Sequence, residues 1–341
     1  MAAVRVLSTV GPAARLTPRA ARRLARCATA ALGAALAAAS VGCGESRPAG
    51  IASGGDPARG AVVFALAGCC GCHTPDGGPA GAGGTEIPTP FGTFHATNLT
   101  SDREHGLGAW SDDEIDRAIR RGELRDGSVE SPVMPYYRYA GMSDRDARDL
   151  VAWLRTLPAS ATPNRPAEGE LPLPRLAYRA WRLLFAGRVT APAEAPEAGV
   201  ERGAYLARHV SICGDCHTPR DRFGVSIPSL ELAGVPGGGP LPWAPNVTPD
   251  RETGVGDWDV SDLENLLATG FTPEYDNVQG AMAEVVDGKA GAPGYGRAPA
   301  SDLAAIAAWM KTIPPIHRVV REDGADPADA NAPAATKEKP A

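Results

Sequence analysis

The sequence is poor in aromatic residues, and it lacks the alternation of apolar and polar residues that is typical of strands. Phe, Trp and Tyr make up 6% of its 341 residues, whereas Gly (40) and Pro (32) are abundant. The apolar stretch at residues 27–42 is too short and too weakly apolar for a membrane-spanning helix. These features indicate small helical units joined by long irregular loops, with enough chain for two or three modest domains.

Residues 1–42 contain six arginines but no acidic residue. Together with the apolar stretch, this is the pattern of a secretory signal peptide, so we expect an exported, periplasmic protein. The segment closes with Ala39-Ser40-Val41-Gly42-Cys43, which resembles a bacterial lipoprotein processing site. Cys43 would then carry a lipid anchor, with residues 43–56 as a flexible lead and the outer membrane as the favoured location. Ordinary cleavage after a nearby small residue is the alternative.

Acidic charge dominates the rest of the chain. The formal net charge of −6 includes the six arginines of the signal segment, so the remainder carries about −12. A surface of this sign argues against nucleic acid and an anionic membrane as partners. It favours a protein with a basic docking face.

Two stretches have the spacing Cys-x-x-Cys-His, Cys69-Cys70-Gly71-Cys72-His73 and Cys213-Gly214-Asp215-Cys216-His217. Two thiols one helical turn apart can add to the two vinyl groups of a haem, and the next histidine supplies the proximal nitrogen to the iron. The pattern predicts two covalently bound haem c groups. The attachment residues would be Cys69, Cys72, Cys213 and Cys216, with His73 and His217 as iron ligands.

Two other interpretations of these cysteines are a redox dithiol and a zinc site. A thioredoxin-like dithiol needs no following histidine and lies in a βαβ setting that this sequence does not show. Zinc would require the two dithiols, far apart in the sequence, to meet. Cys70 is left over inside the first motif, either as a spectator thiol or as a competitor for haem attachment.

The two motifs head two copies of one sequence unit. Residues 98–102 (Asn-Leu-Thr-Ser-Asp) correspond to residues 246–250 (Asn-Val-Thr-Pro-Asp), and each is followed by a Gly-x-Gly-x-Trp stretch ending at Trp110 or Trp258. The repeat selects two methionines, because Met134 and Met282 each lie 24 residues after the paired tryptophan. Carrier haems of this type take methionine sulfur as the second axial ligand. We therefore predict Met134 and Met282 as iron ligands in loops, with core packing as the alternative.

Capping and hydrophobic patterns predict an all-α fold of two tandem class-I-type cytochrome c domains with long loops and one haem c each. Capping boxes at Ser111 and Ser261 would open helices that end near Gly122 and Gly270, and Ser143 and Ser301 would cap the last helices. The expected parts are a signal peptide (1–42), a lead (43–56), cytochrome c domain 1 (57–158), a linker with one helix packed between the domains (159–199), cytochrome c domain 2 (200–317) and a disordered tail (318–341).

Residues from about 57 to 315 resemble the cytochrome c subunits of bacterial membrane-associated dehydrogenases, such as those for alcohol and gluconate. The resemblance is carried by stretches such as Arg202–Leu206, Cys213–Arg220, Pro90–Thr93, Met134–Tyr136 and Gly280–Val286. It implies electron transfer from a partner dehydrogenase towards a respiratory acceptor, a cytochrome or an oxidase. Those subunits usually hold three haem modules and this sequence holds two motifs, so the quinone-facing step is not carried over.

An electron carrier, a fixed cytochrome subunit of a larger oxidoreductase and a di-haem enzyme all fit these residues. A carrier with both irons closed by histidine and methionine would not be an enzyme, and it could move freely, be tethered through the lipid, or be a fixed subunit of an oxidoreductase. A di-haem enzyme such as a peroxidase would instead need one open iron with an acid or base nearby. The matched methionines favour electron transfer.

Overall fold

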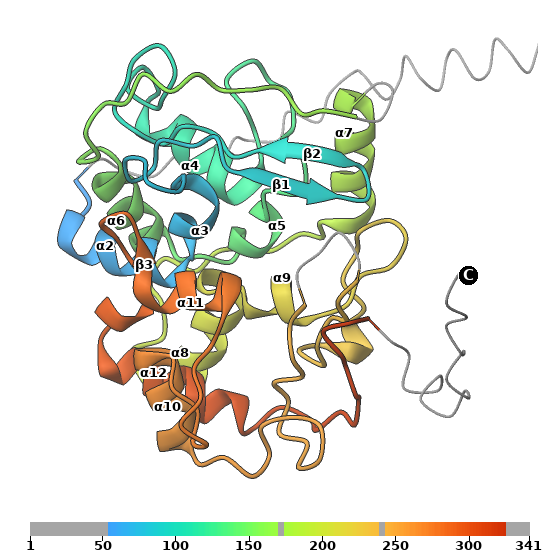
Figure 1. Ribbon diagram of the computed structural model, residues 1–341. Coiled ribbons are helices and arrows are strands. Elements are labelled where there is room, and N and C mark those ends of the chain that lie inside the picture. The colour runs from blue at the N-terminus through green and yellow to red at the C-terminus, as the bar shows by residue number, and fades with distance from the viewer. Residues whose placement is uncertain (1–53, 170–173, 239–242, 325–341) are drawn as a thin grey trace, which may run out of the picture. The chain divides into compact units, whose positions relative to one another are not determined.

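The computed structural model describes residues 54–169, 174–238 and 243–324, and these are mainly helical (Figure 1). The predicted signal peptide, Cys43 and most of the lead lie outside the described residues, as does the tail beyond residue 324. The helices of the first half are α2 (Pro57–Leu66), α3 (Cys69–His73), α4 (Asp112–Arg121), α5 (Tyr136–Tyr139), α6 (Asp144–Leu154) and α7 (Pro174–Phe185). Those of the second half are α8 (Gly199–Tyr205), η1 (Leu206–Val210), α9 (Cys213–His217), η2 (Pro228–Leu230), α10 (Val260–Thr269), α11 (Gly280–Asp287), η3 (Tyr295–Arg297) and α12 (Ala300–Met310).

Two short antiparallel hairpins correct the prediction of an all-α fold. Strand β1 (Glu86–Thr89) pairs with β2 (Gly92–His95), and β3 (Gly288–Lys289) pairs with β4 (Ala292–Pro293). Strands of two to four residues are too short to leave an alternating pattern in the sequence. They are therefore visible only in the structure.

Two helix pairs show the same close crossing, α2 on α6 and α8 on α12. A Cβ atom added to Gly60 of α2 would lie 1.9 Å from the carbonyl oxygen of Asp149. One added to Gly203 of α8 would lie 1.9 Å from the carbonyl oxygen of Ala305. Only glycine permits so close an approach of two backbones. Because both glycines stand in an Arg-Gly-Ala sequence, the repeat in the sequence is also a repeat in packing.

The predicted ends of the first-half helices are confirmed. Ser111 and Glu114 form a capping box at the start of α4, and Gly122 ends that helix with a φ of 62°. At the start of α6, the Ser143 side chain accepts a hydrogen bond from the backbone N–H of Asp146. Local capping chemistry decides these ends, which is why the sequence predicts them.

The predicted starts of the second-half helices are wrong by two residues each. Helix α10 follows Asp259, which forms a capping box with Asp262, so the expected cap at Ser261 lies inside the helix. Helix α12 begins at Ala300, directly after Pro299, and not after Ser301. A proline with φ near −60° readily leads into a helix, so it takes the position we expected for the serine. The predicted end of α10 at Gly270 is confirmed.

The buried apolar residues form one continuous cluster that draws on both halves of the chain. It includes Phe64 and Leu150 from the first half, and Leu206, Leu263 and Ile306 from the second. The sequence boundaries between residues 158 and 200 therefore separate two repeats and not two separate cores.

The linker has the expected helix, and the start of the tail differs from expectation. The linker contains one helix, α7, which contacts Tyr137 of the first half and Phe223 of the second but has no fully buried residue. Residues 318–324, expected in a disordered tail, are hydrogen-bonded to the second half. The backbone N–H of Arg318 donates to Thr253 Oγ1 at 3.0 Å, and that of Gly237 donates to the carbonyl oxygen of Arg321 at 2.9 Å. These contacts extend the ordered chain past residue 317.

Candidate functional site

Each Cys-x-x-Cys-His motif forms a short helix of its own, α3 in the first half and α9 in the second. Each helix follows a residue in the left-handed conformation, Gly68 with a φ of 63° and Ile212 with a φ of 45°. This conformation is strained for isoleucine. The backbone geometry at the entrance of the motif is therefore retained even where the residue type does not favour it.

The two motif histidines are held in the same way. Nδ1 of His73 lies 2.7 Å from the carbonyl oxygen of Thr97, and Nδ1 of His217 lies 2.9 Å from that of Pro245. A carbonyl oxygen can only accept, so Nδ1 carries the proton in both rings and Nε2 keeps its lone pair. Burial lowers the pKa of both histidines, which favours the neutral ring. Each side chain thus presents a free, oriented nitrogen of the kind that binds haem iron.

The thiols at the attachment positions are accessible, and the additional thiol is not. Cys72 and Cys216 are exposed, and Cys69 and Cys213 are half-buried. Cys70 is fully buried, and its Sγ–H lies 3.8 Å from the carbonyl oxygen of Glu284 in the second half. Burial also raises the pKa of the Cys70 thiol. The donor set fits a covalently held haem, and Cys70 points away from it into the core.

Sequence reasoning missed the residues that hold the two acceptor carbonyls in place. Asn98 and Asn246 directly follow Thr97 and Pro245, and both are buried. Asn98 Nδ2 donates to the carbonyl oxygens of Ser160 and Thr162, and Asn246 Nδ2 donates to that of Ile316. Each asparagine thus ties the carbonyl segment to the chain that follows α6 or α12. The repeated Asn-x-Thr-x-Asp stretch was the available signal.

The predicted methionine ligands occupy different local structures. Met134 lies in a turn directly before α5, as expected, whereas Met282 lies in the first turn of α11 and not in a loop. Both are half-buried and pack against the core. Met142 and Met310 are buried within the core. The role of Met134 and Met282 as iron ligands stays a prediction.

The segment after Met134 contacts the attachment helix of the other half. The Tyr137 hydroxyl donates to Asp215 Oδ1 at 2.9 Å, and Arg138 Nη2 donates to the carbonyl oxygen of Gly214 at 3.4 Å. Asp215 and Gly214 are the two residues between the cysteines of the second motif. Arg220 Nη1 donates to the Tyr137 hydroxyl at 2.8 Å.

The helix that carries Met282 contacts the first motif in turn. Helix α11 packs on α3, and the Glu284 carbonyl oxygen receives the Cys70 contact described above (Figure 1). Lys289, just beyond α11, bridges the two halves, because its Nζ lies 2.7 Å from Asp76 and 3.1 Å from Glu284. The two halves therefore dock reciprocally, each methionine segment on the other half's attachment helix.

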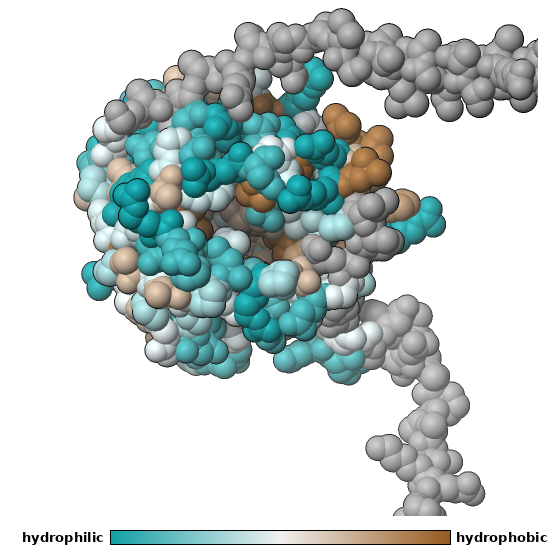
Figure 2. Space-filling model, turned by 90° about the horizontal axis from the view of Figure 1, so that it is seen from above, coloured by the Kyte–Doolittle hydropathy of each residue, from teal (hydrophilic) through white to brown (hydrophobic). Residues whose placement is uncertain are grey.

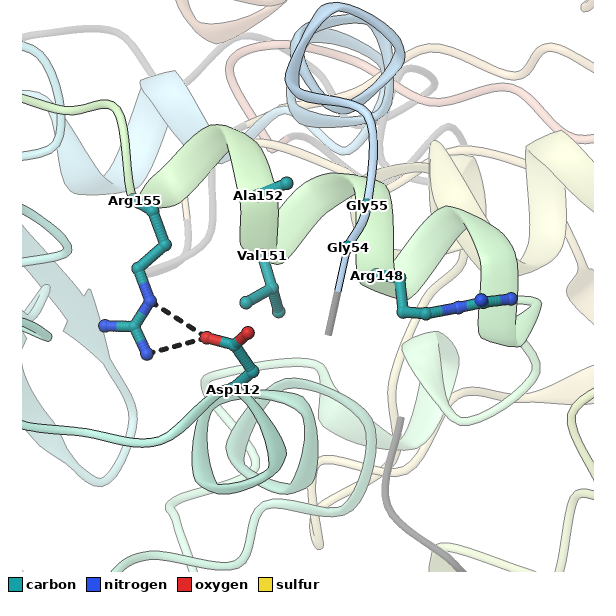
Figure 3. Close-up of a pocket in the computed structure, with 7 residues that line it drawn as sticks. All are labelled: Gly54, Gly55, Asp112, Arg148, Val151, Ala152 and Arg155. Carbon is teal, nitrogen blue, oxygen red and sulfur yellow. Dashed lines mark hydrogen bonds and ion pairs between the residues drawn. The ribbon is translucent and has the colours of Figure 1, made fainter. Parts of the chain in front are cut away.

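A small pocket of about 260 Å³ lies elsewhere, beside α6 (Figure 3). Arg155 points across it to Asp112 and donates at 3.0 and 2.8 Å, whereas Arg148 points away. It contains none of the predicted haem residues. Within residues 54–169, 174–238 and 243–324, no three His, Cys, Asp or Glu side chains are placed to hold a metal ion. Over the same ranges, no helix has the length and apolarity needed to span a bilayer.

The sequence is similar to known cytochromes c. Residues 57–158 match the family model described as "Cytochrome c". The chain is 36% identical over 270 residues to a protein of Cereibacter sphaeroides named "Diheme cytochrome c-type", covering 77% of this chain and 87% of that protein. The resemblance expected from the sequence is confirmed.

Subunits of dehydrogenases are also among the relatives. The cytochrome c subunit of the alcohol dehydrogenase (quinone) of Gluconobacter oxydans is 34% identical over 270 residues, or 76% of this chain. The fructose dehydrogenase cytochrome subunit of Gluconobacter japonicus is 31% identical over 263 residues, or 75% of this chain. The chain spans 55% and 52% of the length of these two subunits.

Proposed function

The chain belongs to the cytochrome c family, and on that premise we propose that it is a di-haem electron-transfer protein with both irons closed by histidine and methionine. The single observation that carries the proposal is that the motif histidine is held in the same way in both halves. In both halves a backbone carbonyl fixes the tautomer of the motif histidine and leaves Nε2 free. A haem bound there supplies a metal that gains and loses one electron.

The residues of this chain have four tasks in such a protein. Cys69, Cys72, Cys213 and Cys216 hold the two haems, and His73 and His217 provide the proximal nitrogens. Met134 and Met282 close the distal sides, and the reciprocal docking of the two halves holds each of these segments in place. No acid–base step is assigned to any residue, because an electron carrier needs none. The two halves are then tandem cytochrome c domains that share one core.

The partners follow from the relatives. Cytochrome subunits of dehydrogenases support a dehydrogenase as electron donor. We propose a respiratory cytochrome or oxidase as the acceptor, on the periplasmic side, with a lipid at Cys43 holding the protein to the membrane. A fixed subunit stays with its donor and a shuttle does not, so co-purification with a dehydrogenase distinguishes the subunit from the free and tethered forms.

Carbon monoxide titration of the reduced, haem-loaded protein tests the proposal. Carbon monoxide binds an open ferrous iron and is excluded where a strong sixth ligand holds its place. We expect no change in the haem spectrum of either site. Ready binding at one haem would refute the proposal and favour the peroxidase-like alternative, in which one iron is open to substrate.

A further inference from the structure

Helix α7 is attached to the protein through its arginines. Three arginines contact the loop at residues 123–127, which belongs to the first half. They are Arg175 with Asp126 at 3.0 Å, Arg179 with the Gly127 carbonyl oxygen at 2.8 Å, and Arg182 with Glu123 at 2.7 Å. These contacts hold one edge of the helix to the first half, and its less exposed residues, Ala177, Tyr178 and Trp181, lie on the side that faces the protein.

The leucines of α7 point away from the protein. Leu183 is 85% exposed, Leu184 72% and Leu176 64%. Figure 2 shows strongly hydrophobic residues gathered at the edge where α7 lies in Figure 1. Because these leucines stay exposed in the folded protein, folding does not remove them from water. A cluster of exposed leucines of this kind indicates a surface that binds a protein or a membrane.

An aromatic row holds this face in position. The ring centroids of Tyr137 and Trp181 are 5.2 Å apart, those of Trp181 and Phe185 5.9 Å, and those of Phe185 and Phe223 6.0 Å. The indole N–H of Trp181 also donates to the carbonyl oxygen of Phe223 at 3.0 Å. Half of Phe223 is exposed beside the helix. We call α7 together with Phe223 the α7 surface.

The charge around the α7 surface is positive, against the sign of the whole chain. Residues 174–193 contain four arginines and no acidic residue, whereas the chain carries a formal −6. Asp126 and Glu123 compensate Arg175 and Arg182, so the excess positive charge of this segment comes from Arg179 and Arg188. Arg222 adds a fifth cation, its guanidinium 4.8 Å from the ring centroid of Phe223. Outward leucines, a Trp and Phe row and flanking arginines are the composition of a helix that lies in a membrane interface.

We propose that the α7 surface binds an anionic lipid bilayer, with its leucines in the acyl region and the flanking arginines at the headgroups. A bilayer satisfies both parts at once, since acyl chains cover the leucines and anionic headgroups meet the excess positive charge. The α7 surface includes no residue of either haem motif. It would turn a protein held by a lipid into one that lies on the membrane in one orientation.

Vesicle flotation of the haem-loaded chain from Gly44 onward tests this. For this experiment the protein is produced behind a substitute leader whose removal adds no lipid, so that binding through Cys43 is excluded. Every contact described here lies within residues 54–324. Vesicles contain either phosphatidylethanolamine with one quarter phosphatidylglycerol or phosphatidylcholine alone. We expect binding to the anionic vesicles that is at least several-fold stronger than to the neutral ones and that weakens with salt.

The variant L183E is the main test, with F271E as its matched control. Leu183 and Phe271 are both exposed, so either change adds the same charge with little loss of packing. L183E should lower binding roughly tenfold or more, because a charge replaces inserted apolar area, and F271E should leave it unchanged. Absence of binding by the parent chain, or equal binding by L183E and the parent, would overturn the proposal. Dimerisation abolished by L183E without vesicle binding would also overturn it and assign the face to a second copy. Carbon monoxide titration of the same preparations reports on the haem function separately.

Discussion

Tyr137 and Asp215, which belong to different halves of the chain, are joined by a hydrogen bond of 2.9 Å from hydroxyl to carboxylate. Tyr137 lies three residues after Met134, and Asp215 stands between the two cysteines of the second haem motif. Arg220 completes the contact, 2.6 Å from Asp215 and 2.8 Å from the Tyr137 hydroxyl. The methionine segment predicted for one haem is thus fixed by the attachment helix of the other.

Replacing Tyr137 by Phe should lower the free energy of unfolding by about 1–2 kcal/mol, because a hydrogen bond to a charged group is lost at a half-buried position. Chemical denaturation followed at the haem absorption band measures the change. Tyr275→Phe is the control, since Tyr275 is 94% exposed. Equal stability of Y137F and Y275F would contradict the role given to the contact between the halves.

Replacing Met134 by Ala should remove the sixth ligand of one haem iron, and replacing Met282 by Ala should remove that of the other. Reduced M134A and M282A should then bind one equivalent of carbon monoxide per protein, whereas the parent binds none. Met142→Leu is the matched control, because Met142 is fully buried in the core and the change keeps its volume. If M142L also binds carbon monoxide, or if M282A does not, the assignment of the methionine ligands is wrong.

Replacing Cys70 by Ala should leave haem attachment intact. Mass spectrometry of the C70A protein should give the mass of the chain plus two haems, with an unchanged pyridine haemochrome spectrum. The cost is about 1 kcal/mol of stability, from the small cavity left by a buried thiol. Cys69→Ala, three positions before Cys72, should instead shift the haemochrome band, since one thioether is lost. A shifted band in C70A would show that Cys70 takes part in attachment.

Replacing Gly60 by Ala should destabilise the protein by about 1–3 kcal/mol, because the new Cβ would lie 1.9 Å from a backbone oxygen of α6. Thermal unfolding measures the change. Gly71→Ala is the control, because its Cβ would meet only the Glu284 carboxylate, at 3.8 Å. An unfolding temperature of G60A equal to that of G71A would contradict the close crossing of α2 and α6.

Acidification should weaken the protein through His209. Burial lowers the pKa of this histidine in the folded state, although its Nδ1 donates to the Arg138 carbonyl oxygen at 3.2 Å. The unfolded chain, with a histidine pKa of about 6.5, then binds more protons than the folded one as the pH falls through that value. The contribution of His209 to stability is therefore complete above about pH 6.5 and is lost progressively below it.

Denaturation at several pH values between neutral and mildly acidic tests this. The His209→Gln variant should lose less stability than the parent over that interval, because it removes one of the groups that bind protons on unfolding. Parallel curves for the parent and the variant would exclude His209 as a source of the pH dependence.

Local chemistry explains what the sequence determined by itself. Haem attachment requires two thiols and a histidine within five residues, so both motifs are complete in the sequence. Ser111, Ser143 and Gly122 predict helix ends because caps act on the nearest turn. The Arg-Gly-Ala and Asn-x-Thr-x-Asp repeats mark, respectively, the close helix crossings and the segments that hold the motif histidines.

Only the tertiary structure decided what depends on residues far apart in the chain. The spacing of Met134 and Met282 does not reveal that each segment docks on the other half, because those contacts join Tyr137 to Asp215 and Cys70 to Glu284. The burial of Cys70 follows from the same packing. The apolar pattern of α7 likewise predicts a helix but not its orientation, which ion pairs with the loop at residues 123–127 decide. Periodicity shows that a helix has two faces, whereas the partners available in the fold determine which face meets the protein.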